Sequence, residues 1–310
     1  MFSGRIITVG ISPAWDVKCL CESLGWGAHI NIEEKTTIPA GKALNVSKAL
    51  AWMNTENIAA GLWGKRDYDA MLEYMKRHKS QMKINMTPVP GCTRENIWVV
   101  DTQNQREIHL RSANALATKK TLSLLGADLQ KIIQKNDTLV FAGALPLESI
   151  SLLKKLSQQN ISLVVDTSGK LLNEIMELKN ISLIKPNIDE LQQLLSKKIQ
   201  DNPASIKKHC EKLLGKVENI LVSRSGKGAM LINKSGCWSA RLIDSPYEVA
   251  GTVGCGDYLL AGFLAGMKEK QSFEYALKCA IISASARAFA IDDKSFNAVK
   301  RKLKVSIEKI

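Results

Sequence analysis

Short apolar runs alternate with helical stretches along the second half of the chain, and this alternation constrains the fold more than any other feature. Four such runs are expected to be strands: 139–142, 161–165, 181–184 and 220–223. Helical patterns at 147–158 and 171–178 lie between them. Apolar strands separated by helices are typical of a parallel sheet covered on both faces. The sequence therefore predicts an α/β protein with a mostly parallel central sheet, and such sheets bind ligands beyond the carboxyl ends of their strands.

Two segments do not follow this alternation, at about 17–38 and 92–112. The first holds no long helix, and the second resembles a hairpin with a polar turn at 102–105. Together they predict a small β sheet that stands off the main domain and serves as a lid. No linker or repeat divides the chain, so residues 1–310 are expected to form one domain. The C-terminal part is expected to be helical, at 273–289 and 296–307.

Composition excludes several classes of protein. There is no run of 18 apolar residues, which argues against a membrane span, and the N-terminus lacks a signal-peptide layout. The seven cysteines include no C-x-x-C pair, so neither a disulfide framework nor a zinc site is indicated, and a reducing cytoplasm is expected.

The net charge of +13 raises nucleic acid and anionic small molecules as partners. The lysines are spread over helical surfaces, and aromatic residues make up only 5% of the chain. Without an arginine-rich arm or an aromatic platform, a solvated basic surface is expected rather than a nucleic-acid partner.

A glycine-rich turn, Gly254-Cys255-Gly256, leads through Asp257 into an apolar helical run. A helix N-terminus carries unpaired N–H groups and partial positive charge, and glycines let an anion approach closely. Asp257 could accept a proton from an alcohol that attacks a phosphoryl group. It could equally be a helix cap, because Asp is a common capping residue.

Two further candidate binding motifs lie in the N-terminal part of the chain, one before a predicted helix and one after the first predicted strand. Gly41, Lys42 and Asn45 come together at a helix start and could hold an anionic substrate, or they could form a plain glycine turn with a solvated lysine. Asp16, after the first strand, is equally suited to a turn or a ligand contact.

Lys185-Pro-Asn187 and Glu190 follow the run at 181–184. The oxygens of Asn187 and Glu190 suit Mg²⁺ or its waters, and the same spacing suits a capping box. Residues 223–228 could contact a nucleotide or form a hairpin loop. Nothing resembles a P-loop.

In order along the chain, seven motifs resemble those of the PfkB (ribokinase-like) sugar kinases, in the branch that contains 1-phosphofructokinase, tagatose-6-phosphate kinase and the minor 6-phosphofructokinase. The motifs are S-P-A-W-D at 12–16, A-G-K-A-L-N at 40–45, T-R-E-N at 93–96, G-A-L-P at 143–146, V-D-T-S-G at 165–169, K-P-N-x-x-E at 185–190 and T-V-G-C-G-D at 252–257. The resemblance spans nearly the whole chain. It implies a ribokinase-like fold with a β-sheet lid that often pairs between subunits, so a homodimer through the lid is expected.

The resemblance also implies roles for individual residues. Asp257 would be the base, and the backbone amides of Gly254, Cys255 and Gly256 would stabilise the transferring phosphoryl group. Three sets of residues would bind the ligands: Asp16, Gly41, Lys42, Asn45, Arg94 and Asn96 the sugar phosphate; Lys185, Asn187, Ser223, Gly226, Gly228 and Thr252 the ATP; and Asn187 and Glu190 the Mg²⁺. Among the substrate residues, Lys42 and Arg94 would meet the phosphate of the acceptor. The implied reaction is ATP-dependent phosphorylation of fructose 1-phosphate to fructose 1,6-bisphosphate.

Several positions depart from the family pattern. The family usually has glycine at the positions of Ala43 and Ser225, and alanine at the position of Cys255. It also usually has a glycine within the segments that correspond to 111–114 and 290–293, and this chain has none there. These departures leave tagatose 6-phosphate and fructose 6-phosphate open as acceptors, and also a non-catalytic protein that binds a sugar phosphate. Cys255, at a helix N-terminus, is predicted to have a lowered pKa and to be reactive.

Overall fold

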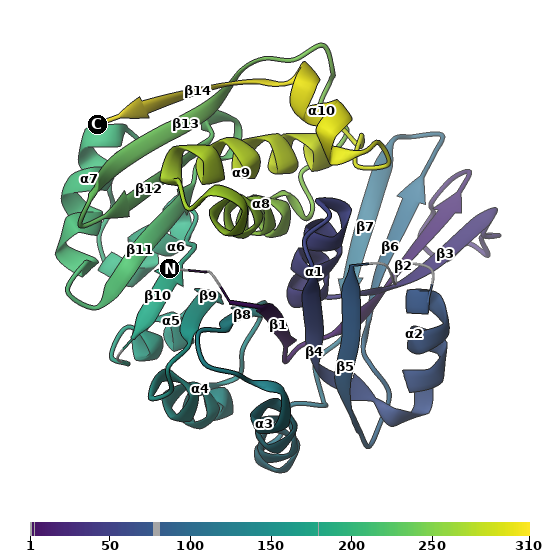
Figure 1. Ribbon diagram of the computed structural model, residues 1–310. Coiled ribbons are helices and arrows are strands. Elements are labelled where there is room, and N and C mark those ends of the chain that lie inside the picture. Colours follow the sequence, from purple (N-terminus) through teal and green to yellow (C-terminus); the bar gives the residue numbers. More distant parts are fainter. Residues whose placement is uncertain (1, 3, 77–80, 179) are drawn as a thin grey trace.

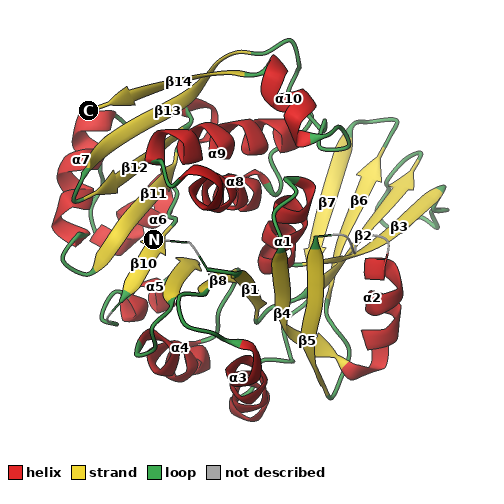
Figure 2. Cartoon of the chain, viewed as in Figure 1, coloured by secondary structure: helices red, strands yellow, loops and turns green. Residues whose placement is uncertain are grey.

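The computed structural model describes residues 2, 4–76, 81–178 and 180–310, and the strands among them form two separate sheets (Figures 1 and 2). The larger sheet has ten strands in the order β14-β13-β12-β11-β10-β9-β8-β1-β4-β5. Neighbours from β5 to β11 run parallel, and β12, β13 and β14 add antiparallel at one edge. The predicted mostly parallel sheet is confirmed.

The strands of this sheet are β1 (Ile6–Gly10), β4 (Asn57–Gly64), β5 (Met82–Val89), β8 (Thr138–Ala142), β9 (Ser162–Asp166), β10 (Ile181–Ile184), β11 (Val217–Ser223), β12 (Ala229–Asn233), β13 (Gly236–Asp244) and β14 (Lys304–Lys309). The α-helices are α1 (Lys42–Trp52), α2 (Tyr68–Met75), α3 (Lys119–Ile132), α4 (Ile150–Ser157), α5 (Lys170–Ile175), α6 (Ile188–Leu195), α7 (Pro203–Cys210), α8 (Cys255–Lys270), α9 (Phe273–Ala288) and α10 (Phe296–Lys302).

Helices cover both faces of the large sheet because its strands are apolar on both faces. In β8, Leu139 and Phe141 pack in one hydrophobic core with α3 and α4, whereas Val140 and Ala142 pack in the other with α1, α8 and α9. This alternation follows from the twofold period of a strand. Helix α6 begins at Ile188, shortly after β10 ends at Ile184, so its N-terminus lies at the carboxyl edge of the sheet. Helices α1 and α8 lie side by side on one face (Figure 1).

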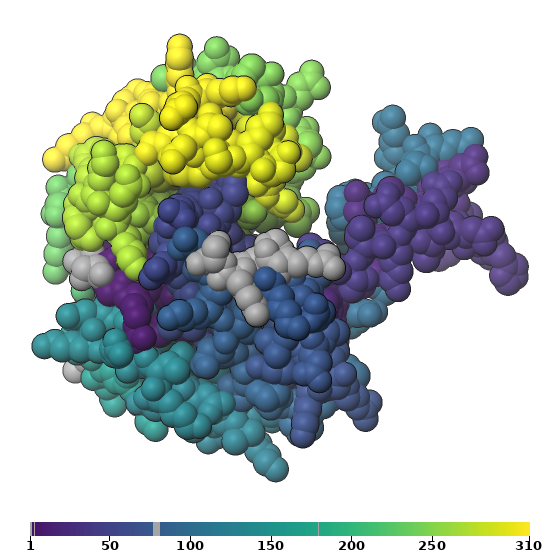
Figure 3. All heavy atoms as spheres, turned by 45° about the vertical axis from the view of Figure 1, so that its right-hand side comes forward, coloured from purple at the N-terminus to yellow at the C-terminus, as the bar shows by residue number. Residues whose placement is uncertain are grey.

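The smaller sheet projects from the side of the molecule (Figure 3). It consists of β2 (Ala14–Cys21), β3 (Glu34–Ala40), β6 (Glu95–Asp101) and β7 (Arg106–Arg111), in the order β3-β2-β6-β7. β2 pairs antiparallel with β3 and parallel with β6, and β6 and β7 form the expected hairpin. The prediction of a separate small sheet is confirmed.

The C-terminal segment differs from its prediction, which was a helix over 296–307. Helix α10 ends at Lys302, and after Leu303 the residues Lys304–Lys309 form the edge strand β14, paired antiparallel with β13. Val305 and Ile307 pack on the core, and polar side chains alternate with them. That period of two belongs to a strand, so the helix prediction was wrong there. No helix in the described part of the chain is long and apolar enough to cross a membrane.

Candidate active site

The carboxyl ends of the adjacent strands β9, β10 and β11 bring distant motifs to one edge of the large sheet. Asp166 ends β9, Lys185 directly follows β10, and Ser223 ends β11. Helices α1 and α8 approach the same edge from one side. Asn45, in the first turn of α1, donates a hydrogen bond from Nδ2 to Oδ2 of Asp257 over 2.9 Å. The structure therefore joins the 40–45 motif to the 252–257 motif.

The turn before α8 carries two backbone N–H groups that have no acceptor among the described residues. Gly254 is the N-cap with φ of 84°, a conformation that favours glycine, and no side chain caps the helix. The N–H of Cys255 bonds to the carbonyl of Thr252 at 3.3 Å, and the N–H of Asp257 bonds to that of Gly254 at 3.0 Å. Within the described part of the chain, the N–H groups of Gly254 and Gly256 have no hydrogen-bond partner. These two N–H groups form a candidate anion hole.

Asp257 is a buried acid and not a helix cap. Its side chain is 4% exposed and accepts its hydrogen bond from Asn45 rather than from the helix backbone. Burial, and then the nearby charge of Asp166, raise its pKa from 3.8 to about 6, although the hydrogen bond from Asn45 and the charges of Lys42 and Lys185 oppose this. A carboxylate with such a pKa is ionised at neutral pH and is a better proton acceptor than an exposed one.

Two lysines approach Asp166 beside Asp257. Lys185 Nζ lies 3.3 Å from Asp166 Oδ1, and Lys42 Nζ lies 3.7 Å from the same atom. A Cβ atom at position 256 would lie 3.4 Å from Lys185 Nζ, so the buried ammonium group is next to the anion hole. The ion pair of Lys42 is with Asp166, whereas Arg94 donates to Asn96 Oδ1 and to the carbonyl of Ser112, just beyond β7. The predicted pairing of Lys42 with Arg94 at one phosphate finds no support in these contacts.

Asn187 and Glu190 form the capping box that the sequence left open. Asn187 Oδ1 accepts from the N–H of Glu190, and Glu190 Oε2 accepts from the N–H of Asn187. This leaves Glu190 Oε1 at the carboxyl edge, and Mg²⁺ in phosphoryl-transfer sites commonly takes one or two carboxylates, waters and phosphates. The described residues hold no cluster of three metal-ligating side chains. A carboxylate oxygen of Glu190 in this position fits a magnesium ion held largely through water and phosphate.

The remaining nucleotide candidates lie beside Asn187. Residues 223–228 join the antiparallel strands β11 and β12, so they are a hairpin loop, and the N–H of Ser223 bonds to the carbonyl of Pro186 at 3.0 Å. A Cβ at Gly228, whose φ is 89°, would lie 2.0 Å from the carbonyl oxygen of Ala240, so only glycine fits there. Gly226 has open space around its Cα, and Thr252 is exposed on the turn before α8.

The small sheet carries a second polar group at its base. Asn96 Nδ2 donates to Oδ1 of Asp16 at 2.7 Å, and Arg94 donates to Oδ1 of Asn96 at 2.8 Å. The Nε atom of Arg94 is buried with no partner among the described residues. Gly41, at the start of α1, has φ of 117°, and a Cβ there would lie 3.2 Å from Pro13 Cα, which allows the chain to pass close to β2.

Comparison with known proteins agrees with this geometry. The model of the pfkB family carbohydrate kinases matches residues 5–292. The chain belongs to this family. The tagatose-6-phosphate kinase of Staphylococcus epidermidis is 26% identical over 283 residues, 88% of each chain. The 1-phosphofructokinase of Bacillus subtilis is 27% identical over 293 residues, 92% of this chain and 93% of the relative.

The fold has close neighbours among solved structures. The crystal structure of phosphofructokinase-2 from Escherichia coli in complex with fructose-6-phosphate has a TM-score of 0.85 at 20% identity, over 96% of this chain and all of that one. The ribokinase-like fold is therefore confirmed, and the pfkB protein described here is a phosphotransferase.

One prediction for this kinase is wrong, the lowered pKa of Cys255. Burial raises the pKa of the thiol, the carboxylates of Asp257 and Asp292 raise it further, and the charge of Arg287 opposes them. Its Sγ lies 3.9 Å from the carbonyl oxygen of Gly251. The position at a helix N-terminus is outweighed because desolvation penalises the thiolate.

Sequence reasoning gave no role to two residues of the candidate site, Asp166 and Arg111. Asp166 lay in a recognised motif, but only the fold brings it close to Lys42 of α1 and to Lys185, which follows β10. Arg111, opposite Asn96 in the β6–β7 pairing, lies near Arg94, and burial together with its charge lowers the pKa of Arg94 although Asp16 opposes this. The signal for Arg111 in the sequence was its place in the predicted hairpin, where it pairs directly with Asn96 of the T-R-E-N motif.

Proposed function

We propose that this protein transfers the γ-phosphoryl group of ATP to a hydroxyl group of a sugar phosphate, with fructose 1-phosphate as the preferred acceptor and fructose 1,6-bisphosphate as the product. The observation that carries the proposal is the position of Asp257. A buried carboxylate with a raised pKa is held by Asn45 next to two N–H groups that have no partner in the described part of the chain. A base beside an anion hole is what transfer of a phosphoryl group to an alcohol requires.

In the proposed reaction, Asp257 accepts the proton of the acceptor hydroxyl as its oxygen attacks the γ-phosphorus. The new O–P bond forms while the bond from the γ-phosphorus to the bridging oxygen breaks, and ADP leaves with that electron pair. The free N–H groups of Gly254 and Gly256, with the ammonium of Lys185, stabilise the negative charge on the transferring group. The proton then passes from Asp257 to solvent.

The nucleotide would lie along the carboxyl edge between α6 and α8. Lys42 and Lys185, brought together by Asp166, supply positive charge where the phosphates meet the turn. Ser223, Gly226, Gly228 and Thr252 would line the rest of the ATP site. Magnesium, bound through Asn187, Glu190 and water, would neutralise charge on the β- and γ-phosphates.

The acceptor would bind between α1 and the base of the small sheet. Asp16, Asn45 and Asn96 offer hydrogen bonds to sugar hydroxyl groups, and Gly41 lets the sugar approach the backbone. Arg94 and Arg111 would take the phosphate already on the sugar, because an anion there satisfies the unpaired Nε of Arg94 and relieves the repulsion between two cations. This pair favours a sugar phosphate over a free sugar.

The small sheet would close over the acceptor as a lid and join two copies of the chain. The face of the sheet opposite Asp16 and Asn96 is apolar: Val17 and Ile97 are in register, and Ile97 pairs with Leu110. Leu110 is 53% exposed in the single chain. A second copy packed on this face would bury it, and the substitution Leu110→Lys would then shift the sedimenting species from dimer to monomer.

A turnover assay tests the proposed function. The purified protein is incubated with MgATP and, in parallel, fructose 1-phosphate, tagatose 6-phosphate, fructose 6-phosphate or free fructose, and ADP release is followed. The highest kcat/KM is expected for fructose 1-phosphate and the lowest for the free sugar. A highest kcat/KM for tagatose 6-phosphate or fructose 6-phosphate would make that compound the preferred acceptor instead. If none of the four supports ADP release, the proposed reaction fails and the alternative is a non-catalytic protein that binds a sugar phosphate.

A further inference from the structure

An arginine outside the family motifs holds the turn that forms the anion hole. Arg287 lies in the last turn of α9, and its Nε donates to the carbonyl oxygen of Val253 at 3.2 Å. A Cβ atom at Gly254 would lie 3.4 Å from this same Nε. The guanidinium group therefore lies directly against the Val253–Gly254 peptide.

Holding this carbonyl fixes the direction of a catalytic N–H. The carbonyl of Val253 and the N–H of Gly254 belong to one planar trans peptide, so they point in opposite directions. Gly254, with φ of 84°, is a residue type whose backbone turns easily, and its N–H has no partner among the described residues. A hydrogen bond to the Val253 carbonyl keeps the Gly254 N–H turned away from Arg287, toward the other side of the turn.

A second contact extends this support to the residue after Asp257. Arg287 donates to Oδ2 of Asp292 at 3.2 Å, and the hydroxyl of Tyr258 donates to the same oxygen at 2.7 Å. In addition, the N–H groups of Ala250 and Gly251 both bond to the carbonyl of Ala288. The C-terminal end of α9 thus holds the turn before Gly254 and the helix residue beyond Asp257.

We propose that Arg287 is a positioning residue, which orients the Val253–Gly254 peptide so that the N–H of Gly254 donates to the transferring phosphoryl group. The inference rests on the proposed function. Because an anion hole acts on charge that develops in the transition state, its loss lowers kcat and leaves ground-state binding nearly unchanged.

The test compares Arg287→Ala with the wild-type enzyme. We expect kcat to fall by about 10- to 100-fold, less than the 10²–10³-fold typical when an oxyanion donor is itself removed, with both KM values within about twofold. Guanidinium chloride at millimolar concentration is expected to restore part of kcat, and sodium chloride at equal ionic strength is not. Lys278→Ala is the matched control, since it removes one cation from α9 about 13 Å along the helix axis.

Asp292→Asn is the second variant, for use if Arg287→Ala does not fold. It keeps a partner for the Tyr258 hydroxyl and weakens the contact to Arg287, so a smaller fall in kcat is expected with KM unchanged. Unaltered kcat in the variant that folds, or a raised KM for ATP at normal kcat, would overturn the inference, and so would the absence of any response to guanidinium in Arg287→Ala. A wild-type enzyme inactive with every acceptor would instead show that the proposed function has failed.

Discussion

Two buried aspartates, one in each sheet region, have opposite surroundings. Asp257 at the edge of the large sheet accepts one hydrogen bond and lies near another carboxylate, and its pKa is raised to about 6. Asp101, at the tip of the small sheet, is completely buried, yet its pKa is lowered. Burial raises the pKa of Asp101 too, but hydrogen bonds from the backbone of Asn104 and Leu24 outweigh it, with help from the Asn104 side chain and Arg106.

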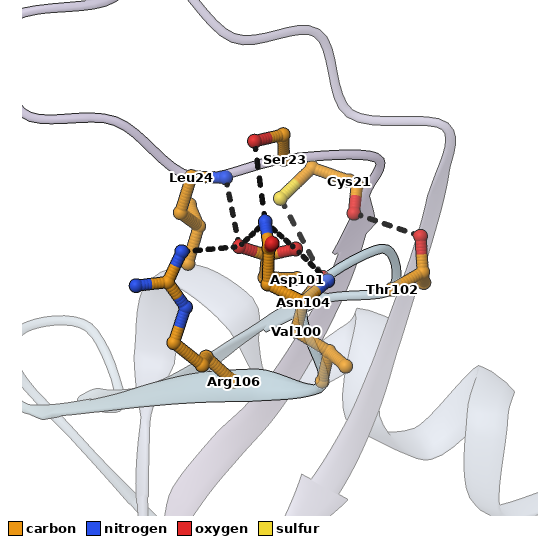
Figure 4. Close-up of polar contacts among 8 residues, drawn as sticks. All are labelled: Cys21, Ser23, Leu24, Val100, Asp101, Thr102, Asn104 and Arg106. Carbon is orange, nitrogen blue, oxygen red and sulfur yellow. Dashed lines mark hydrogen bonds and ion pairs between the residues drawn. The ribbon is translucent and has the colours of Figure 1, made fainter.

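Figure 4 shows how the second arrangement works. The carboxylate of Asp101 lies between the N–H of Leu24, the backbone and side-chain nitrogens of Asn104, and the guanidinium of Arg106. These contacts fix the β6–β7 turn to the chain that leaves β2. Asp101 is therefore a structural residue. The comparison teaches that burial alone does not mark a catalytic acid: the acid with few partners is the one suited to taking up a proton.

The largest test of this contrast is Asp257→Asn. We expect kcat to fall by about two orders of magnitude or more, because general-base catalysis is lost. Stability at pH 7 should not fall. A pKa raised from 3.8 to about 6 means that the folded state disfavours the carboxylate, so removing the charge stabilises the fold by up to about 3 kcal/mol. Turnover and thermal unfolding of the same preparation measure both effects, and near-normal turnover would contradict the base assignment.

Arg94→Ala tests whether residues of the small sheet bind the sugar phosphate while residues of the large sheet carry out phosphoryl transfer. We expect the KM for the sugar phosphate to rise by about 10- to 100-fold, as for the loss of a charge-assisted contact, while the KM for ATP changes little. Initial rates at varied concentrations of each substrate measure the two constants. Lys18→Ala, on the same sheet and with its ammonium over Trp98, is the charge control. Equal increases in both KM values would contradict the separation.

The sequence predicted the sheet, the separate small sheet and the glycine turn, because those depend on local patterns. It did not predict β14, since a short edge strand after a helix has a weak local signal and takes its conformation from pairing with β13. The roles of Asp166 and Arg287 depend on partners from other elements, Lys42 and Lys185 in one case and Val253 in the other. The predicted lowering of the Cys255 pKa was wrong for the same reason. Burial and two carboxylates, which only the fold brings close, raise this pKa by more than the helix N-terminus lowers it.

The pH dependence of kcat/KM sharpens the comparison further. Asp257 must be ionised to accept a proton, so activity should fall by about tenfold per pH unit below pH 6 and level off above it. The phosphate of the acceptor also titrates near pH 6. The residual activity of Asp257→Asn separates the two groups. An acid limb that persists in the variant belongs to the substrate, and one that disappears belongs to Asp257.

The smallest effect on catalysis is expected for Asp101→Asn. An amide keeps the shape of the side chain, but it places an NH₂ group among donors that need an acceptor, so the midpoint of thermal unfolding should fall while kcat stays within about twofold.

The direction in which the stability contributed by Asp101 changes with pH follows from its lowered pKa. The stability that Asp101 contributes is present above pH 3.8 and is lost as the pH falls through its lower folded-state pKa. The difference in the free energy of unfolding between wild type and Asp101→Asn should therefore be constant from pH 5 to 8. The corresponding difference for Asp257→Asn should grow as the pH rises to about 6 and then stay constant. Glu107→Gln, at an exposed carboxylate on β7, is the control for loss of charge on the same sheet. A fall in kcat as large as that of Asp257→Asn would mean that the tip of the small sheet takes part in closing the site, and the two aspartates would no longer divide into one structural and one catalytic residue.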